Sequence, residues 1–383
     1  MTPAHQYLFV YHRPKLASDY CDALAGKTFL LNATSGLFLA APRRTGKSTF
    51  LREDLVPEME RRGWETLYVD LWSNKNTDPA ELITRTIRTA LEKHDGVVKK
   101  AARSVGLDRL TVMGVLSMDL TKIGQSGGAT LAEALQILHD KSGKPIALLI
   151  DEAQHALTTE AGTQAMFALK AARDQLNQGG DGMGLYLVMT GSNRDKLTHM
   201  VLRKSEPFYG AKISEFPMLD ENFVRTYADS LNKQFAEGKK FSVDALKRAF
   251  DLVGHRPEAF IDVVADTVSR YGGAAGLDAY LATNALRLQD AIWADFESGV
   301  NGLTDIQRTV LDTIVRLPPG SELFSDAAMQ AYKAALGKDI SVSSAQGALD
   351  GLRDKGLVWR AGRGNYVLED SSMRDWYLTK FPG

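Results

Sequence analysis

The sequence lacks the features that would place the protein in a disulfide-bonded, secreted or membrane-spanning class. Cys21 is the only cysteine among 383 residues, which excludes an intramolecular disulfide and a cysteine zinc site. No apolar run is long enough to span a bilayer. The N-terminal residues show no basic segment followed by an apolar core, so no secretory signal is visible. Together these absences predict a cytoplasmic protein with no membrane partner.

An excess of charge is also missing. The formal net charge is −1, so bulk charge does not indicate a nucleic-acid binder, although a localised basic face stays open. A hydrophobic content of 44% indicates a globular chain with a true core. The length allows two or three domains, and no internal repeat is evident. Indications of function are therefore confined to short motifs.

One stretch carries most of the functional signal. It fits the phosphate-binding loop pattern Gly-x-x-x-x-Gly-Lys-[Ser/Thr] with alanine in place of the first glycine. An apolar strand-like run, 36–40, precedes it, and helix formers follow over 48–62. The alternative is a chance match before an ordinary helix. The candidate nucleotide contacts are Ala41, Pro42, Arg43, Arg44, Thr45, Gly46, Lys47, Ser48 and Thr49.

The chemistry of phosphate binding requires this order of residues. Backbone N–H groups of the loop and of the helix N-terminus form an anion cradle. Gly46 takes conformations that other residues avoid and has no side chain to block the phosphate. Lys47 can reach the β- and γ-phosphates, and the hydroxyl of Ser48 can ligate Mg²⁺. Ala41 is compatible with a cradle if its φ is not positive.

A second motif lies about a hundred residues further on. The continuous apolar run 145–150 predicts a buried parallel strand, and it ends in Asp151 and Glu152. In P-loop NTPases an acidic residue at this strand tip holds Mg²⁺, which assigns that role to Asp151. Glu152 is then the candidate to activate the attacking water. The alternative is that both residues only cap the next helix.

A third strand is expected over 185–190. Ser192 and Asn193 follow it and are candidates to contact the γ-phosphate or the water. One sequence does not separate the two, and Gly-Ser-Asn is also ordinary turn chemistry.

In this order the motifs resemble the archaeal-ATPase-like group, which is related to the STAND and Orc1/Cdc6-type AAA+ ATPases. The quoted residues are 41–48, 148–154 and 190–193, followed by Pro-Phe-Tyr-Gly at 207–210 and the stretch 213–219. The resemblance runs from about residue 8 to the C-terminus. It implies an AAA+-like α/β fold, a parallel sheet with helices on both faces, followed by a helical lid and a winged helix. It also implies ATP and Mg²⁺ as ligands.

The resemblance adds further residues to the candidate site. His255, Arg256 and Pro257 fall where related ATPases place a lid side chain near the nucleotide, with Arg256 near the sensor-2 arginine. A helix-breaking loop with a surface arginine is the alternative. Arg203 or Arg194 would reach the neighbour's site if the protein forms a homo-oligomer; a solvated basic residue is the alternative for each.

The chain is expected to divide into an ATPase domain (1–218), a lid (219–300) and a winged-helix domain (301–383). Core strands are expected at 38–40, 66–71, 146–150 and 185–190, and lid helices at 220–232, 242–252, 257–271 and 277–298. The stretch 98–128 is less regular and is expected to be an insertion with a strand or hairpin at 111–121. It has no assigned role.

The last 83 residues should hold helices at 304–315, 325–336 and 343–355 and strands at 356–360 and 365–368. In DNA-binding winged helices the third helix enters the major groove and the wing touches phosphate. Residues 301–383 contain ten Lys or Arg and ten Asp or Glu, so packing on the lid or on a protein partner is equally open. The candidate phosphate contacts on duplex DNA are Arg353, Lys355, Arg360 and Arg363.

Two function classes follow. The first is an ATPase that couples nucleotide state to the arrangement of lid and winged helix and acts on DNA. The second is a nucleotide-dependent switch whose winged helix binds a protein effector. The balanced charge favours the switch, and the basic residues of the wing favour DNA. A small-molecule kinase fits less well because it gives no role to the lid and the winged helix.

Overall fold

The computed structural model describes most of the chain. Asn193, Arg203, Arg363 and the expected strand at 111–121 lie outside the described residues. No helix in the described part has both the length and the apolar composition that a bilayer span requires. The described ranges are 9–28, 31–104, 123–124, 129–178, 184–192, 194–202, 205–236, 238–271, 276–318, 320–362 and 364–382.

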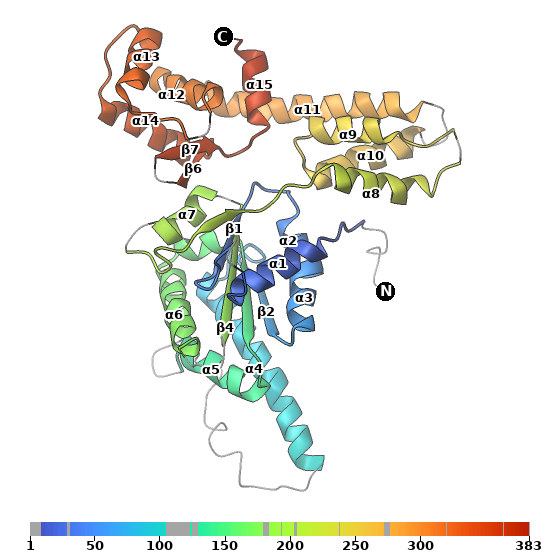
Figure 1. Ribbon diagram of the computed structural model, residues 1–383, viewed down its shortest axis with the longest axis vertical. Coiled ribbons are helices and arrows are strands. Elements are labelled where there is room, and N and C mark those ends of the chain that lie inside the picture. Colours follow the sequence, from blue (N-terminus) through green and yellow to red (C-terminus); the bar gives the residue numbers. More distant parts are fainter. Residues whose placement is uncertain are drawn as a thin grey trace.

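A five-stranded parallel sheet forms the centre of the first two hundred residues (Figure 1). Its order is β2-β3-β4-β1-β5, and each pairing is parallel. All strands therefore end at one edge, where the loops that follow them meet. The strands are β1 (Leu37–Ala40), β2 (Glu65–Asp70), β3 (Ile146–Asp151), β4 (Leu185–Gly191) and β5 (Ile213–Glu215).

Both faces of this sheet are buried. Ile146, Leu148 and Ile150 point into the hydrophobic cluster formed with α4, α5 and α6. Ala147 and Leu149 point into the opposite cluster, with α1 and the helical segments after β1. Alternate side chains of one strand thus enter different cores, which is why the strand reads as a continuous apolar run. The expected sheet with helices on both faces is confirmed.

The helical segments of this part follow the strands in alternation. A π-helical turn, η1, interrupts the helix that follows the phosphate loop. Pro57 explains the interruption, because it has no N–H to donate to the preceding turn. The segments are α1 (Pro14–Leu24), α2 (Lys47–Phe50), η1 (Leu51–Leu55), α3 (Val56–Arg61), α4 (Pro79–Ser104), α5 (Leu131–Ser142), η3 (Ala153–Thr158), α6 (Glu160–Leu176) and α7 (Arg194–Leu202).

Four helices make up the next part and enclose their own apolar cluster. They are α8 (Glu221–Asn232), α9 (Val243–Leu252), α10 (Pro257–Tyr271) and α11 (Leu277–Asn301). Ser242 caps α9 by accepting from the N–H of Ala245, and Asp220 caps α8 in the same way. The helix boundaries expected from the sequence agree with these to within three residues.

The last part, which we call the C-terminal module (residues 303–382), holds three helices, a hairpin and a fourth helix among its described residues. Its cluster is separate from that of the lid, yet Trp293 and Phe296 of α11 pack against both. Figure 1 shows α11 running from the lid to the C-terminal module. The elements are α12 (Asp305–Arg316), α13 (Asp326–Leu336), α14 (Val342–Asp354), β6 (Val358–Gly362), β7 (Asn365–Leu368) and α15 (Met373–Lys380).

Two sequence expectations were wrong. The irregular stretch was expected to begin at Val98, but α4 continues to Ser104. The fifth strand, β5, was not among the expected core strands, because three residues give too short a pattern to recognise. The domain boundaries at 218 and 300 stay predictions.

Candidate active site

The phosphate loop lies between β1 and α2, at the edge where the parallel strands end. Gly46 has a φ of 87°, in the left-handed region, and its missing side chain leaves open space above the loop. Arg44 also has a positive φ, whereas Ala41 does not. The alanine in place of the first glycine therefore causes no left-handed backbone strain.

Lys47 is the first residue of α2, and its side chain is buried. Its ammonium donates to the carbonyl oxygens of Ala41 at 2.7 Å and Pro42 at 2.9 Å. Burial lowers the pKa of Lys47 to about 8, against the opposing attraction of Glu152 and Asp151. An incoming phosphate would supply the negative charge that this buried cation lacks.

The two loop arginines point in different directions. Arg43 Nε lies 3.4 Å from the hydroxyl oxygen of Ser192 at the end of β4. Arg44 instead pairs with Glu258 of α10, at 3.6 Å, with both side chains exposed. Thr45 donates to the carbonyl oxygen of Pro42 at 2.9 Å and so braces the loop from within.

Asp151 is held between the neighbouring strands. It accepts a hydrogen bond from the Tyr68 hydroxyl of β2 at 2.9 Å and another from Thr190 of β4. These bonds fix a buried carboxylate at the end of β3, and Ser48 of α2 lines the cavity described below. A carboxylate and a hydroxyl suit Mg²⁺, which takes few protein oxygens and completes its shell with water and phosphate. Ser48 and Asp151 would hold the ion, whose positive charge would offset the negative charge of the phosphates.

Glu152 follows in an unusual backbone conformation, with φ 55° and ψ 41°. Its Oε2 accepts from the Ser192 hydroxyl at 2.7 Å and from the Ser192 N–H at 3.3 Å. Gln154 donates to the same oxygen. A glutamate that must adopt a left-handed conformation at a strand end is held there by its surroundings, which is common at functional sites.

Gly191, the last residue of β4, packs closely against Gln154 of η3 and Leu197 of α7. A Cβ at this position would lie 2.7 Å from the Gln154 side-chain oxygen, closer than atoms can approach. The glycine therefore leaves room for the side chain of Gln154, which reaches Glu152 from η3. Ser192 is also in contact with the candidate base. The role of Ser192 in hydrolysis stays a prediction.

A cavity of about 1050 Å³ opens above the loop and extends to the lid. Its lining includes Arg43–Phe50 on the sheet side and Glu152 at the strand edge. On the lid side α8 and α10 contribute mainly apolar residues, among them Tyr227, Leu231 and Ile261. A polar end at the phosphate loop and an apolar end at the lid match a ligand with a charged group and a flat ring.

Sequence reasoning missed the segment just before α1. Phe9, Tyr11 and Arg13 line the same cavity. The segment is tied to the helix after the loop, because Asp54 accepts from His12 at 3.0 Å and from the Arg13 N–H at 3.1 Å. The available signal was Asp54, an acidic residue three positions after Leu51 and directly before Leu55, on the face that these two leucines bury.

No protein-family model matches the chain, and no curated protein sequence matches it. Among solved structures, the Walker-type ATPase PABY2304 of Pyrococcus abyssi is 14% identical, with 95% of each chain covered and a TM-score of 0.54. The ORC2 protein of Aeropyrum pernix in its ADP form is 12% identical, covering 98% of this chain and 95% of its own, with a TM-score of 0.55. Its ADPNP–ADP complexes give 14% identity, 96% and 91% coverage and a TM-score of 0.51.

The chain has the AAA+ P-loop ATPase fold. Its structural neighbours are archaeal AAA+ ATPases of the Orc type, matched over nearly the whole chain. The sequence resemblance to this group is thereby confirmed at the level of the fold.

Only one of the three lid candidates of this AAA+ fold lines the cavity. Pro257, the first residue of α10, does so. Arg256 instead forms an ion pair with Asp370 of the C-terminal module. His255 lies 3.2 Å from the carbonyl oxygen of Leu219 and pairs with Asp251 at 3.3 Å. The expected nucleotide contacts of Arg256 and His255 therefore compete with partners that these side chains already have.

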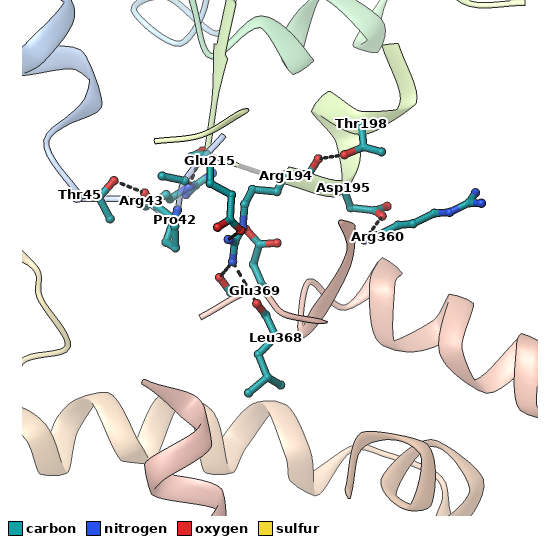
Figure 2. Close-up of polar contacts among 12 residues, drawn as sticks. Pro42, Arg43, Thr45, Arg194, Asp195, Thr198, Glu215, Arg360, Leu368 and Glu369 are labelled. Atoms are coloured by element: carbon teal, nitrogen blue, oxygen red, sulfur yellow. Dashed lines mark hydrogen bonds and ion pairs between the residues drawn. The ribbon is translucent and has the colours of Figure 1, made fainter. Parts of the chain in front are cut away.

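The C-terminal module packs against the end of β4 through Arg194, the first residue of α7. The buried guanidinium donates to the carbonyl oxygens of Leu368, at 3.0 Å, and Glu369. It also lies over the Trp359 ring at 4.4 Å and pairs with Glu215 at 3.3 Å. Figure 2 shows Arg194 between Glu215 and Glu369, with the phosphate loop beside it.

Glu369 is a partly buried acid whose charge acts on Lys47 of the phosphate loop. Burial raises its pKa to about 7, although Arg194, 3.4 Å away, favours the carboxylate. The Glu369 carboxylate also raises the pKa of Lys47, and the Arg194 cation lowers it. A residue of the C-terminal module thus acts electrostatically on the phosphate-binding lysine, which the sequence did not indicate.

Two of the predicted DNA contacts lie at the same interface. Arg353 of α14 donates to both carboxylate oxygens of Asp195, at 2.9 and 3.1 Å, and its side chain is 17% exposed. The backbone N–H of Arg360 lies 3.4 Å from Asp195 (Figure 2). Lys355 is exposed. In this arrangement Arg353 binds a carboxylate of α7, and a DNA contact would require it to leave that partner.

Proposed function

We propose that the protein is an ATPase that binds and hydrolyses ATP and couples its nucleotide state to the arrangement of the lid and the C-terminal module. One observation carries the proposal: the phosphate loop, Asp151, Glu152 and Ser192 lie at the edge where the parallel strands end. The loop and Glu152 line one end of a cavity that reaches the lid. This combination provides a phosphate cradle, a metal-binding carboxylate, a base and a space for the nucleoside.

Each residue has a distinct role in the proposed reaction. Loop N–H groups and Lys47 bind the phosphates, with Ser48 and Asp151 holding Mg²⁺. Glu152 orients a water and takes its proton as the water oxygen attacks the γ-phosphorus. Ser192 donates to the Glu152 oxygen at 2.7 Å and fixes the direction of the carboxylate. ADP leaves as the bond to the β–γ bridging oxygen breaks.

The coupling to the C-terminal module is proposed from two links. Arg194 follows two residues after Ser192 and is bound to the Leu368 and Glu369 carbonyls. Arg256, next to the cavity-lining Pro257, is bound to Asp370. The module therefore contacts both the hydrolysis side and the lid side of the site, and a change at either is transmitted to residues 368–370.

For the target of this motion we propose duplex DNA, reached when the module leaves α7. Lys355, Arg360 and Arg363 supply the positive charge, and Arg353 joins them once it is released from Asp195. The second candidate is a switch that acts on a protein effector. The observation that favours it is the burial of Arg353 against Asp195, which leaves the third helix facing its own ATPase part.

Turnover of ATP by the wild type and Glu152→Gln, with and without duplex DNA, tests the proposal. The wild type should hydrolyse ATP, and Glu152→Gln should bind ATP with a similar Kd but lose at least about 100-fold in turnover. Wild-type hydrolysis by the Glu152→Gln protein would contradict the assigned base. Absence of nucleotide binding by the wild type would contradict the function itself.

The assays with duplex DNA distinguish DNA from a protein effector as the target. DNA-stimulated turnover, with binding that weakens steeply between about 50 and 200 mM salt, supports action on DNA. Retained ATP binding with slow turnover that DNA does not change supports the effector switch.

A further inference from the structure

We infer that Arg43 is a catalytic residue of the proposed hydrolysis, contacting the γ-phosphate from within its own chain. The inference rests on the proposed function and assigns a residue that the motif alone leaves undefined, since position 43 of the phosphate loop is a variable one. It also differs from the expectation that an arginine of a neighbouring subunit, Arg203 or Arg194, supplies this charge.

The first observation is the position of Arg43. It lines the same cavity as Lys47 and Glu152, and its side chain is exposed to that space. Its Nε lies 3.4 Å from the Ser192 oxygen, so the side chain turns towards the hydrolysis side of the loop. The neighbouring Arg44 turns to the lid and Glu258. Of the two loop arginines, Arg43 is therefore the one beside the candidate base.

The second observation is the missing counter-ion. Arg44 pairs with Glu258, Arg194 with Glu215 and Glu369, and Arg256 with Asp370. Within the described part of the chain, Arg43 forms no ion pair. Its neighbours are the Ser192 hydroxyl and the ring of Trp72, 5.1 Å from the guanidinium carbon. A guanidinium held by a hydroxyl and an aromatic ring keeps its charge available for an anion.

The third observation is a directional chain of hydrogen bonds. Arg43 Nε–H donates to Ser192 Oγ, and the Ser192 hydroxyl donates to Glu152 Oε2 at 2.7 Å. The cation is thus two hydrogen bonds from the group that accepts the proton of water. When Arg43 moves to the γ-phosphate, the Ser192 hydroxyl keeps its bond to Glu152, so the base stays oriented as the phosphate is engaged.

The chemical step is the hydrolysis of the terminal phosphoanhydride. The water oxygen forms a bond to the γ-phosphorus, one water proton passes to Glu152, and the bond from phosphorus to the bridging oxygen breaks. The products are ADP, inorganic phosphate and a proton that Glu152 returns to solvent. Negative charge spreads over the equatorial oxygens of the γ-phosphoryl group, and Arg43 stabilises them in that state more than in bound ATP.

The test compares wild type, Arg43→Ala and Arg43→Lys, with Arg225→Ala as the control for loss of an arginine on the exposed face of α8. Three quantities are measured: the Kd for ATP, single-turnover hydrolysis, and trapping of ADP with aluminium fluoride, which mimics the transferring phosphoryl group. Thermal unfolding checks that every variant folds.

For Arg43→Ala we expect an ATP Kd within about threefold of wild type, hydrolysis reduced about 100-fold or more, and loss of the aluminium fluoride complex. Free guanidinium at low millimolar concentration should restore part of the rate, which a purely structural role would not allow. The hydrolysis rate of Arg43→Lys should lie between those of the wild type and Arg43→Ala, because an ammonium keeps the charge but lacks the planar fork of a guanidinium.

Two outcomes overturn the assignment and differ from each other. If the wild type binds and hydrolyses ATP and the hydrolysis rate of Arg43→Ala is within threefold of the wild-type rate, Arg43 is not catalytic. The proposed function then still stands. If the wild type neither binds ATP nor traps ADP with aluminium fluoride, the proposed function fails and the role of Arg43 fails with it.

Discussion

Arg194 donates a hydrogen bond to the main-chain oxygen of Leu368 at 3.0 Å, across 174 residues of sequence. The acceptor belongs to the hairpin of the C-terminal module, and the donor begins the helix after the strand that carries Ser192. The contact joins the nucleotide site to the C-terminal module through a main-chain carbonyl, so substitutions of the Leu368 side chain leave it in place.

Glu369 should make stability depend on pH in a defined window. Its pKa is raised from 4.5 to about 7, so the folded state holds a proton that the unfolded state loses between these values. The free energy of unfolding should therefore fall as pH rises from 4.5 to 7. Relative to Glu369→Gln, which cannot titrate, the loss should be about 3 kcal/mol.

Urea unfolding followed by tryptophan fluorescence measures this difference, since Trp359 is buried at the same interface. Parallel pH curves for the wild type and Glu369→Gln would contradict the raised pKa.

The Arg353–Asp195 ion pair should stabilise the folded protein at neutral pH, and this stabilisation should be lost in acid. The pKa of Asp195 is lowered from 3.8 to about 2, against its burial, by hydrogen bonds from His199 and Arg353. The stabilisation is present above pH 3.8 and disappears as pH falls towards 2. A double-mutant cycle with Arg353→Ala and Asp195→Ala should give a coupling of about 2 kcal/mol at pH 7.

The same variants test the DNA contact. If Asp195→Ala releases the module, it should raise affinity for duplex DNA, whereas Arg353→Ala should lower it. Unchanged DNA affinity in Asp195→Ala would show that the pair does not restrain the module.

Lys47 should bind nucleotide less well as pH rises through about 8, because burial lowers its pKa to that value and the neutral amine is not attracted to phosphate. Without nucleotide, the free energy of unfolding should change in the opposite direction and increase with pH. The unfolded state binds the extra proton between about 8 and 10.5, so the free energy of unfolding rises over this range, by about 3 kcal/mol relative to Lys47→Met.

Isothermal titration with ATP at pH 7 and pH 9 measures the first effect. Lys47→Met should show almost no binding at either pH. If Lys47→Met binds ATP with the same affinity as the wild type, Lys47 does not belong to the phosphate site.

Ser192→Ala should reduce hydrolysis about tenfold and leave the ATP Kd nearly unchanged. The hydroxyl orients Glu152 through a 2.7 Å hydrogen bond and also accepts from Arg43. Single-turnover assays give the rate. Ser192→Thr, which keeps a hydroxyl, is the matched control and should retain more activity than the alanine variant. Equal rates for alanine and wild type would remove Ser192 from the mechanism.

The sequence predicted the parts of this molecule that depend on local pattern. The run 145–150 is apolar because both of its faces are buried, and Gly46 is needed where φ is positive. The acidic pair after the run was placed at the sheet edge from parallel-strand geometry. Each of these inferences used neighbouring residues and the chemistry of phosphate.

What the sequence did not predict are pairings between distant segments. Arg353 and Arg256 were expected to face external anions, but Asp195 and Asp370 lie opposite them. A helical pattern gives the face on which an arginine lies, and it does not say which other element covers that face. For the same reason the cavity-lining segment at 9–13 was missed.

The continuous helix α11 makes the lid and the C-terminal module parts of one lever. Its 25 residues correspond to about 37 Å, and Trp293 and Phe296 are packed into the clusters at both ends. A lid rotation of about 10° at the nucleotide would move the far end of such a rod by about 6 Å. Under the proposed coupling, a displacement of ångström size at the phosphates would be amplified before it reaches the wing.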